Sequence, residues 1–263
     1  MSSQIRLSHD ADLQVDLLVA DRLTHIFSTH AHPELLIAAF AEGAEVFHAA
    51  GKSWTASAGD LLVVPPGLAH DGAAASPKGY SYRACYVPRS TLERTIEGAN
   101  IEGLPAEPLI LRGSDLGERT FKNLEALGAR DLSALERQES LTSLLADVLN
   151  AVCGQHDATR RAAPRAAIRV REFLHEHFAA QLKAADLAEV AGVSASRLAH
   201  LFSAAYNCSP GVYQMALRLA EARRLIGTGG ELAGIAAQLG FADQAHLTRR
   251  FKAAFGVTPG RFG

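Results

Sequence analysis

The sequence has no long hydrophobic run and few cysteines. It contains 263 residues, and none of its apolar segments reaches the about 18 residues that mark a membrane-spanning helix. The first segment, MSSQIRLSHDADLQ, has neither the basic head nor the apolar core of an export signal, so we expect a cytoplasmic protein without a membrane partner. The cysteines Cys85, Cys153 and Cys208 form no CxxC pair, which favours reduced, half-buried thiols over disulfides or a zinc cluster.

Patterns that carry catalysis are also missing. The sequence shows no nucleophile beside a general base and no glycine-rich phosphate loop. Hydrolase and nucleotide-cofactor functions are therefore not predicted, and we expect a protein that is not an enzyme. An apolar share of 48% and a charged share of 21% are those of an ordinary globular protein, and the length favours two domains.

The net charge of −2 conceals two halves of opposite sign. Residues 160–263 contain 14 Lys and Arg against 7 Asp and Glu, whereas residues 1–159 contain 12 against 21. The first count gives a net charge of +7 and the second of −9. A basic module binds polyanions by releasing their counterions, so the C-terminal half is suited to nucleic acid. The alternative is that the division only aids solubility.

Short apolar segments separated by glycines predict β-strands between residues 12 and 88. Strands of this length and spacing are typical of a sandwich or a small barrel. Residues 99–113 hold prolines and glycines among few periodic apolar residues, and we expect a loop there. The predicted strands are LQVDLLVA, THIFST, LLIAAFA, EVFHAA, SWTAS, DLLVVPP and YSYRACYVP.

Residues 114–153 change to a helical period. The apolar residues recur at intervals of three and four, as on one face of an amphipathic helix. Such a face can pack on the sheet or pair two subunits into a homodimer, and the sequence leaves both possibilities open. The polar residues 154–165 end the segment and are typical of an interdomain linker. The apolar face consists of Leu141, Leu144, Leu145, Val148, Leu149 and Val152.

Residues 166–263 are helical in pattern and contain an internal repeat. Residues 187–194 are echoed by residues 235–243, and each copy predicts a short helix, a glycine turn and a second helix. Gly192 and Gly240 can adopt the left-handed conformation that ends a helix. A long helix from Ser209 to about Ile226 joins the two copies. The pattern predicts two helix-turn-helix units in tandem, which present their second helices to the DNA major groove.

The second helix of each unit is capped and has an outward face. Ser194 and Asp243 are placed to accept the free amides at the helix starts. Arginine can bond two guanine acceptors and glutamine two adenine groups, so we expect more base readout from the second unit. We also expect Arg223 and Arg224 to be solvated and His246 to be packed and hydrogen-bonded. The outward residues are Ser196, Arg197, Ala199 and His200 in the first unit, and Gln244, Ala245, Thr248, Arg249 and Arg250 in the second.

The repeat and the segment that follows it resemble the AraC-type transcription regulators. The likeness covers residues 166–262 and is carried by residues 235–241, 243–252 and 255–259. It implies that the two second helices lie parallel in successive major-groove segments of double-stranded DNA, and that the protein contacts RNA polymerase. It also implies an N-terminal cupin-like barrel that binds a small-molecule effector. The larger polar residues common in that family are replaced here by Ser196, Ala199 and Ala245.

The N-terminal half itself carries cupin-like motifs. Residues 59–70 fit the pattern G-x5-P-x-G-x2-H, which ends at His70, and His30-Ala31-His32 resembles the paired histidines of the first cupin motif. Three such imidazoles can hold a divalent metal, so a metal bound by His30, His32 and His70 is possible. The glutamate expected beside them is missing, because its places are Leu36 and Ile37. Candidate effector-binding residues are His30, His32, Trp54, His70 and Tyr82.

Together these features predict an α+β protein in four parts. A cupin-like β-barrel sensing domain (1–113) is followed by a helical segment for dimerisation or packing (114–153), a linker (154–165) and an all-α tandem helix-turn-helix domain (166–263). The leading hypothesis is a transcription regulator that responds to a small molecule. The alternatives are a metal-dependent cupin enzyme with a helical appendage, and a constitutive DNA-binding protein whose N-terminal domain only dimerises.

Overall fold

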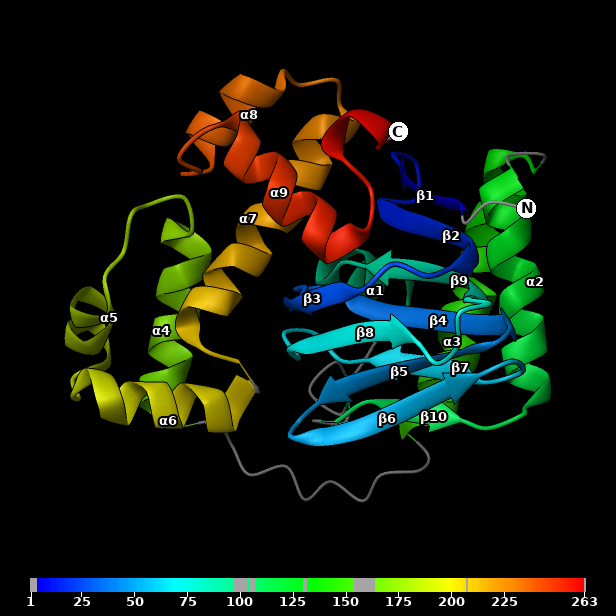
Figure 1. Ribbon diagram of the computed structural model, residues 1–263, viewed down its shortest axis with the longest axis horizontal. Coiled ribbons are helices and arrows are strands. Elements are labelled where there is room, and N and C mark those ends of the chain that lie inside the picture. The colour runs from blue at the N-terminus through cyan, green and yellow to red at the C-terminus, as the bar shows by residue number, and fades with distance from the viewer. Residues whose placement is uncertain are drawn as a thin grey trace.

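A β domain and a helical domain lie side by side in the computed structural model of the chain (Figure 1). The structure describes residues 4–96, 104, 107–129, 132–153, 164–206 and 208–262. Strands fill the N-terminal part and helices the C-terminal part, so the predicted α+β class is confirmed. Among the described residues, no helix combines the length and the hydropathy needed to cross a bilayer.

The β domain consists of two antiparallel sheets that face each other (Figure 1). Strand alternation explains how one sheet buries both of its faces. Along β4, Leu36 and Ala38 point to the space between the sheets, while Leu35 and Ile37 point away from it. The larger sheet has the order β1 (Gln4–Asp10), β2 (Val15–Leu23), β9 (Tyr80–Val87), β4 (Leu35–Glu42), β7 (Leu61–Val64) and β10 (Leu109–Leu111). The smaller has the order β3 (Phe27–His30), β8 (His70–Ala74), β5 (Ala44–Ala49) and β6 (Lys52–Ser57).

Two helices cover the outer face of the larger sheet. They are α2 (Asp115–Ala129) and α3 (Ala134–Cys153). All six apolar residues predicted on one face of α3 are buried, and they form one core with the outward residues of β2, β4, β7 and β9. The packing alternative therefore holds, and this face is not available to a second subunit. Cys85 and Cys208 are free and fully buried, and the side chain of Cys153 lies outside the described residues.

Several elements of the β domain were not predicted. β1 and β8 lie in segments for which the sequence predicts no strand, and α1 (Arg89–Thr95) follows the last predicted strand. The prediction of a loop over residues 99–113 was wrong for β10, which pairs with β7 at the sheet edge. Three residues are too few for a period-two pattern to stand out. Residues 154–163 of the predicted linker lie outside the described part of the chain.

The helical domain contains the two predicted helix-turn-helix units. The glycine turns separate α5 from α6 and α8 from α9, and α7 joins the two units. The bounds are α4 (Arg165–His177), α5 (Ala184–Ala191), α6 (Ala195–Tyr206), α7 (Pro210–Gly227), α8 (Leu232–Gln238) and α9 (Gln244–Phe255), followed by a short 3-10 turn (Pro259–Arg261).

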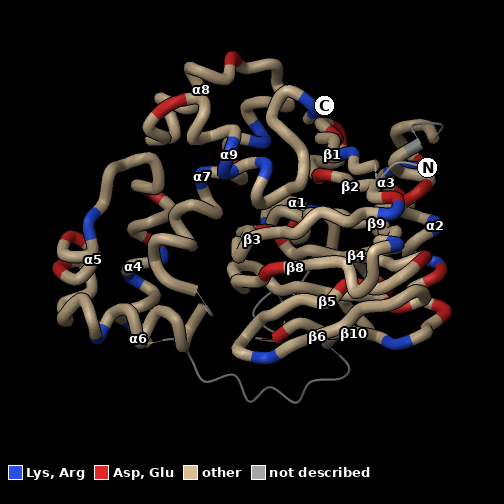
Figure 2. Tube along the Cα trace, in the orientation of Figure 1, with Lys and Arg blue, Asp and Glu red and all other residues tan. Residues whose placement is uncertain are grey.

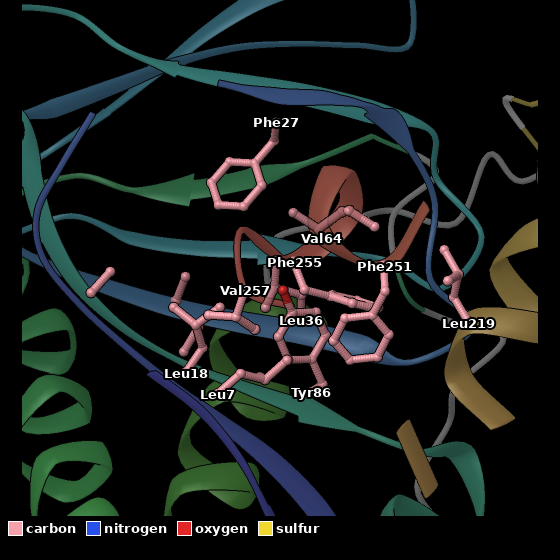
Figure 3. Packing of buried hydrophobic residues seen from close by; sticks show 14 of the residues in the cluster. Leu7, Leu18, Phe27, Leu36, Val64, Tyr86, Leu219, Phe251, Phe255 and Val257 are labelled. Carbon is pink, nitrogen blue, oxygen red and sulfur yellow. The ribbon is translucent and has the colours of Figure 1, made fainter. Parts of the chain in front are cut away.

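The two domains share a hydrophobic core. Figure 3 shows Phe251 and Phe255 of α9 beside Tyr86 of the larger sheet, all in one cluster of buried side chains. The rings of Tyr86 and Phe255 meet edge to face with centroids 6.2 Å apart. Helices α7 and α9 therefore close one end of the space between the sheets, which we call the mouth of the β domain.

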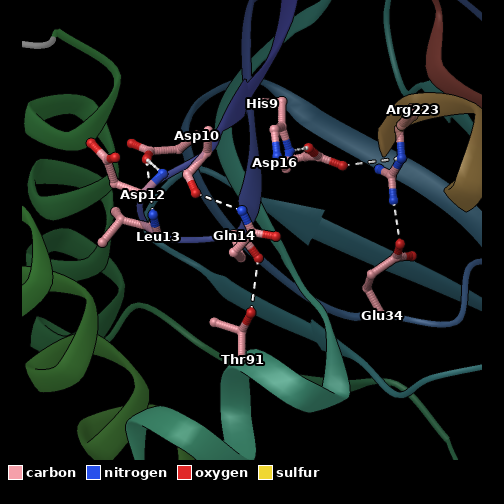
Figure 4. Close-up of polar contacts among 10 residues, drawn as sticks. His9, Asp10, Asp12, Leu13, Gln14, Asp16, Glu34, Thr91 and Arg223 are labelled. Carbon is pink, nitrogen blue, oxygen red and sulfur yellow. Dashed lines mark hydrogen bonds and ion pairs between the residues drawn. The ribbon is translucent and has the colours of Figure 1, made fainter. Parts of the chain in front are cut away.

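A buried arginine joins α7 to the β domain. Arg223 is fully buried, so its predicted exposure to solvent was wrong, whereas the Arg224 side chain is 52% exposed. The Arg223 Nη2 atom lies 2.5 Å from Glu34 Oε1, and its Nε atom lies 3.1 Å from Asp16 Oδ2 (Figure 4). The guanidinium also lies 4.6 Å from the centroid of the Tyr86 ring. Two carboxylates and an aromatic face compensate a charge that would otherwise be costly to bury.

Candidate functional sites: the exposed helices and the mouth of the β domain

Both glycine elbows have the predicted conformation. Gly192 has φ +67° and Gly240 has φ +74°, the left-handed region in which glycine carries no steric penalty. The predicted caps are confirmed as well. Ser194 Oγ accepts the Arg197 N–H at 3.2 Å, and Asp243 Oδ1 accepts the His246 N–H at 2.6 Å. Each second helix therefore begins at a fixed place after its turn.

The outward faces of α6 and α9 lie on the protein surface. Eight of the nine residues predicted to face outward are exposed, and Thr248 is half-buried. The inward residues Leu198 and Phe202 of α6, and Leu247 and Phe251 of α9, are buried. A duplex can therefore reach both faces without any unfolding. The eight exposed residues are Ser196, Arg197, Ala199, His200, Gln244, Ala245, Arg249 and Arg250.

The charge of α9 suits a polyanion. The helix has three basic residues, Arg249, Arg250 and Lys252, and no acidic residue (Figure 2). His246 is half-buried and accepts a long hydrogen bond from Arg250 Nε at 3.3 Å through its Nε2 atom. Partial burial and the nearby arginines lower the pKa of His246. It is the packed, hydrogen-bonded histidine that was predicted.

The two second helices are not parallel. Figure 1 shows α6 along the lower edge of the helical domain, while α9 slants toward the mouth of the β domain. The family resemblance implied that α6 and α9 lie parallel, and this part of the prediction does not hold in this conformation. The C-terminal half of α9 is held by the β domain, because Ala254 and Phe255 are buried in the shared core. Local sequence patterns specify each elbow but not the angle between two units.

Three of the five predicted effector residues line one cavity at the mouth. They are His30 on β3, His70 on β8 and Tyr82 on β9, and Ala254 of α9 closes the cavity. The ring centroids of His30 and His70 lie 4.5 Å apart. Burial is the main cause that lowers the pKa of both histidines, for His30 to about 3, so both are neutral at pH 7.

The other two predicted residues do not line this cavity. His32 is buried behind it, and its ring centroid lies 5.1 Å from that of His70 and 5.2 Å from that of Tyr86. Trp54 lies on β6, where its indole N–H donates to the Ala49 carbonyl at 3.1 Å and its ring stacks on Phe47. Trp54 therefore has a packing role.

The three histidines do not form a metal centre with a nearby acid. Each Nδ1 atom lies within 2.9 Å of a main-chain carbonyl oxygen, which fixes the rings. The nearest acid in the sequence, Glu34, is engaged by Arg223. In the described part of the chain, no group of three or more His, Cys, Asp or Glu side chains is arranged to hold a metal ion.

Sequence reasoning missed most of the cavity wall. Apolar and aromatic side chains from both sheets line it, and two acids, Glu45 and Asp71, join them. Burial is the main cause that raises the pKa of Glu45 to about 8, although a hydrogen bond donated by the Tyr80 hydroxyl at 2.9 Å opposes this effect. Strand alternation could have found the inward positions, but not which of them surround a cavity. The missed residues include Phe27, Leu36, Phe47, Leu62, Val64 and Tyr86.

Comparisons with known proteins agree with this architecture. Residues 13–162 match the family described as AraC-like ligand binding domain, and residues 187–263 match a helix-turn-helix domain. The first match covers more than half of the chain. The chain belongs to the AraC family. As a member of this family, it is a DNA-binding transcription regulator with an N-terminal ligand-binding domain.

Relatives of this AraC-family chain are regulators too. It is 24% identical over 245 residues to the HTH-type transcriptional regulator YbfI of Bacillus subtilis, covering 92% of this chain and 88% of YbfI. It is 27% identical over 94 residues to the HTH-type transcriptional regulator ExsA of Pseudomonas aeruginosa, covering 35% of this chain and 34% of ExsA. The structure of ToxT from Vibrio cholerae, with a bound unsaturated fatty acid, has the same fold with a TM-score of 0.61 at 13% identity, covering 98% of this chain and 94% of ToxT.

The raised pKa of Glu45 in this AraC-family chain predicts how the free energy of unfolding depends on pH. Its folded-state pKa is raised from 4.5 to about 8, so the folded state holds a proton that the unfolded state releases between these values. Its contribution makes the free energy of unfolding fall as pH rises from 4.5 toward 8. We expect Glu45→Gln to remove this contribution, as measured by urea unfolding at pH 5 and pH 8. The exposed Glu93→Gln is the control, and equal slopes for Glu45→Gln and wild type would contradict the prediction.

Proposed function

We propose that this regulator reads its operator chiefly with α9 and binds its effector at the mouth of the β domain. The observation that carries the proposal is that the outward faces of both capped second helices are exposed. The proposal assigns sensing to residues 1–113, support of the sheet to residues 114–153, linkage to residues 154–165 and DNA reading to residues 166–263.

The side chains of α9 suit direct base readout. Arg249 and Gln244 are exposed and can form two hydrogen bonds each with guanine and adenine edges, and Thr248 can contact a thymine methyl group. On α6, Arg197 and His200 are exposed between small residues, which suits phosphate contacts and recognition of DNA shape. The second unit therefore determines more of the operator sequence than the first.

The effector residues proposed are those that line the mouth cavity. His30, His70 and Tyr82 supply polar atoms within an apolar wall, as in typical small-molecule sites. Contact with RNA polymerase stays a prediction of the family resemblance, and pairing into a homodimer stays a prediction that would need a surface other than the buried face of α3. The enzyme alternative is not favoured, because the histidines and acids of the mouth, among the described residues, are not grouped to hold a metal ion.

A DNA-binding titration tests this assignment. Duplexes from the promoters of neighbouring genes are titrated at several salt concentrations against random duplex. We expect Arg249→Ala to weaken specific binding by about tenfold to hundredfold, because a bidentate arginine contributes about 1–3 kcal/mol. The control is Arg119→Ala, a cation that is 64% exposed, on α2, a helix on the side of the β domain away from the helical domain (Figure 1). Wild-type affinity for Arg249→Ala would remove α9 from the reading surface.

A further inference from the structure

The mouth cavity is closed by the helix that reads DNA. It lies between β3, β4, β5, β7, β8 and β9, and Ala254 of α9 completes its wall. Gly256, directly after α9, fits so closely that an added Cβ atom would lie 2.8 Å from Ile5 and 3.3 Å from Phe27. The end of α9 therefore seals the β domain, and any molecule that enters the mouth meets it.

The remaining space is too small for an effector. The cavity has a volume of about 30 Å³, room for one or two water molecules. Pockets for small organic ligands are commonly about 300–1,000 Å³. A larger cleft of about 320 Å³ adjoins the mouth at His30 and Ala254 and opens between β3, α7 and α9. This cleft provides a route for a ligand toward the mouth cavity. Because the cavity itself is nearly filled, α9 must move to make room for the ligand.

The mouth offers a ligand hydrogen bonds but no cation, because no Lys or Arg is among the described residues that line it. The polar groups along its wall include His30, His70, Tyr82, Glu45 and Asp71, and burial lowers the pKa of both histidines and raises that of Glu45. The Asp71 carboxylate is engaged by His48, through the ring at 3.1 Å and the main-chain N–H at 2.8 Å. Among the described residues packed at the mouth, Arg223 is a buried cation that Asp16 and Glu34 already compensate. Inside the cavity a carboxylate ligand would lose its hydration without gaining a counterion, because the cation Arg250 lines only the adjoining cleft.

We propose that the mouth binds an uncharged, mainly apolar small molecule, and that this molecule displaces the end of α9. The proposal rests on the proposed function and specifies the ligand class and the way in which occupancy reaches the DNA-reading helix. Because ligand and α9 compete for one space, whatever stabilises α9 at the mouth weakens ligand binding, and the reverse also holds. The fatty acid bound by ToxT represents a different ligand class from the one proposed here.

The test uses the full chain and two probes of matched shape. At pH 7, 2-naphthol is uncharged and 2-naphthoate is an anion. Each is titrated while amide hydrogen exchange is followed over β3, β8, residues 244–255 and the turn at Gly256. We expect 2-naphthol to bind and to increase exchange at the end of α9 several-fold. We expect 2-naphthoate to do neither.

Two variants on β4 localise the effect. Ala38 is buried and lines the mouth, whereas Ala41 is exposed on the same strand. Ala38→Leu should fill the space and abolish the response to 2-naphthol, and Ala41→Leu should retain it. Binding of 2-naphthol without a change in α9, tighter binding of 2-naphthoate, or binding of neither probe to the wild type would overturn the proposal. The duplex titration uses no probe, so a chain that binds DNA and ignores both probes would keep the proposed function and lose this inference.

Discussion

Gly240→Ala should destabilise the helical domain by about 3 kcal/mol or more, whereas Gly192→Ala should cost about 1 kcal/mol. Both glycines have positive φ, so alanine is strained at either position. Their surroundings differ. A Cβ atom on Gly240 would overlap the main-chain carbonyl oxygen of Ala179, while one on Gly192 would have its nearest neighbour, the Arg169 guanidinium, at 3.6 Å.

The turn at Gly240 is held against the first unit by hydrogen bonds. Arg218 on α7 donates to the Gly240 carbonyl at 2.9 Å and to the carbonyls of Phe178 and Ala180 at 2.7 and 2.9 Å. An alanine at Gly240 must push this main-chain contact apart or open the turn, and either change removes several hydrogen bonds. Urea unfolding of both variants, followed by helical circular dichroism, measures the difference. Equal losses would show that the contact with Ala179 adjusts without cost.

The features of the fold that could be predicted are those determined by residues close together in the sequence. A glycine turn, a capping residue such as Ser194 or Asp243, and an apolar period of three and four are all encoded within a few positions. The exposed faces of α6 and α9 follow from those signals, and the structure confirms their exposure. The stripe on α3 was also predicted, although its partner could not be. The spacing of apolar residues along a helix does not show which apolar surface the helix will cover.

The parts that could not be predicted depend on contacts between distant segments. Glu34 and Arg223 are separated by 189 positions, and no local pattern links them. Leu36 occupies a place where a metal-binding cupin would have an acid, yet only the folded chain shows that its side chain lines a nearly filled cavity. The closure of that cavity by Ala254 could not be read from the C-terminal repeat, because helix-turn-helix patterns describe one unit and not its docking.

Arg223→Met should lower the free energy of unfolding by about 3–5 kcal/mol, because it leaves buried carboxylates without their counterion. The loss of Arg223 should affect Glu34 more than Asp16. Burial already raises the pKa of Glu34, and Arg223 opposes that rise. Asp16 retains a second partner, because His9 Nδ1 lies 2.7 Å from its Oδ1 atom. The neighbouring Arg224→Met is the control, since this exposed arginine pairs with Glu221 at the surface and such pairs contribute about 0–1 kcal/mol.

The double variant Arg223→Met with Glu34→Gln separates lost charge balance from lost packing. If an uncompensated carboxylate causes the damage, removing that charge should recover part of the stability lost in Arg223→Met. Lowering the pH should narrow the gap between Arg223→Met and wild type for the same reason, because protonation neutralises Glu34. Urea unfolding of the four proteins at pH 5 and pH 7 gives the coupling energy between the two residues. Losses that simply add would mean that Arg223 joins α7 to the β domain through its contacts with Tyr86 and Phe255 rather than through the carboxylates.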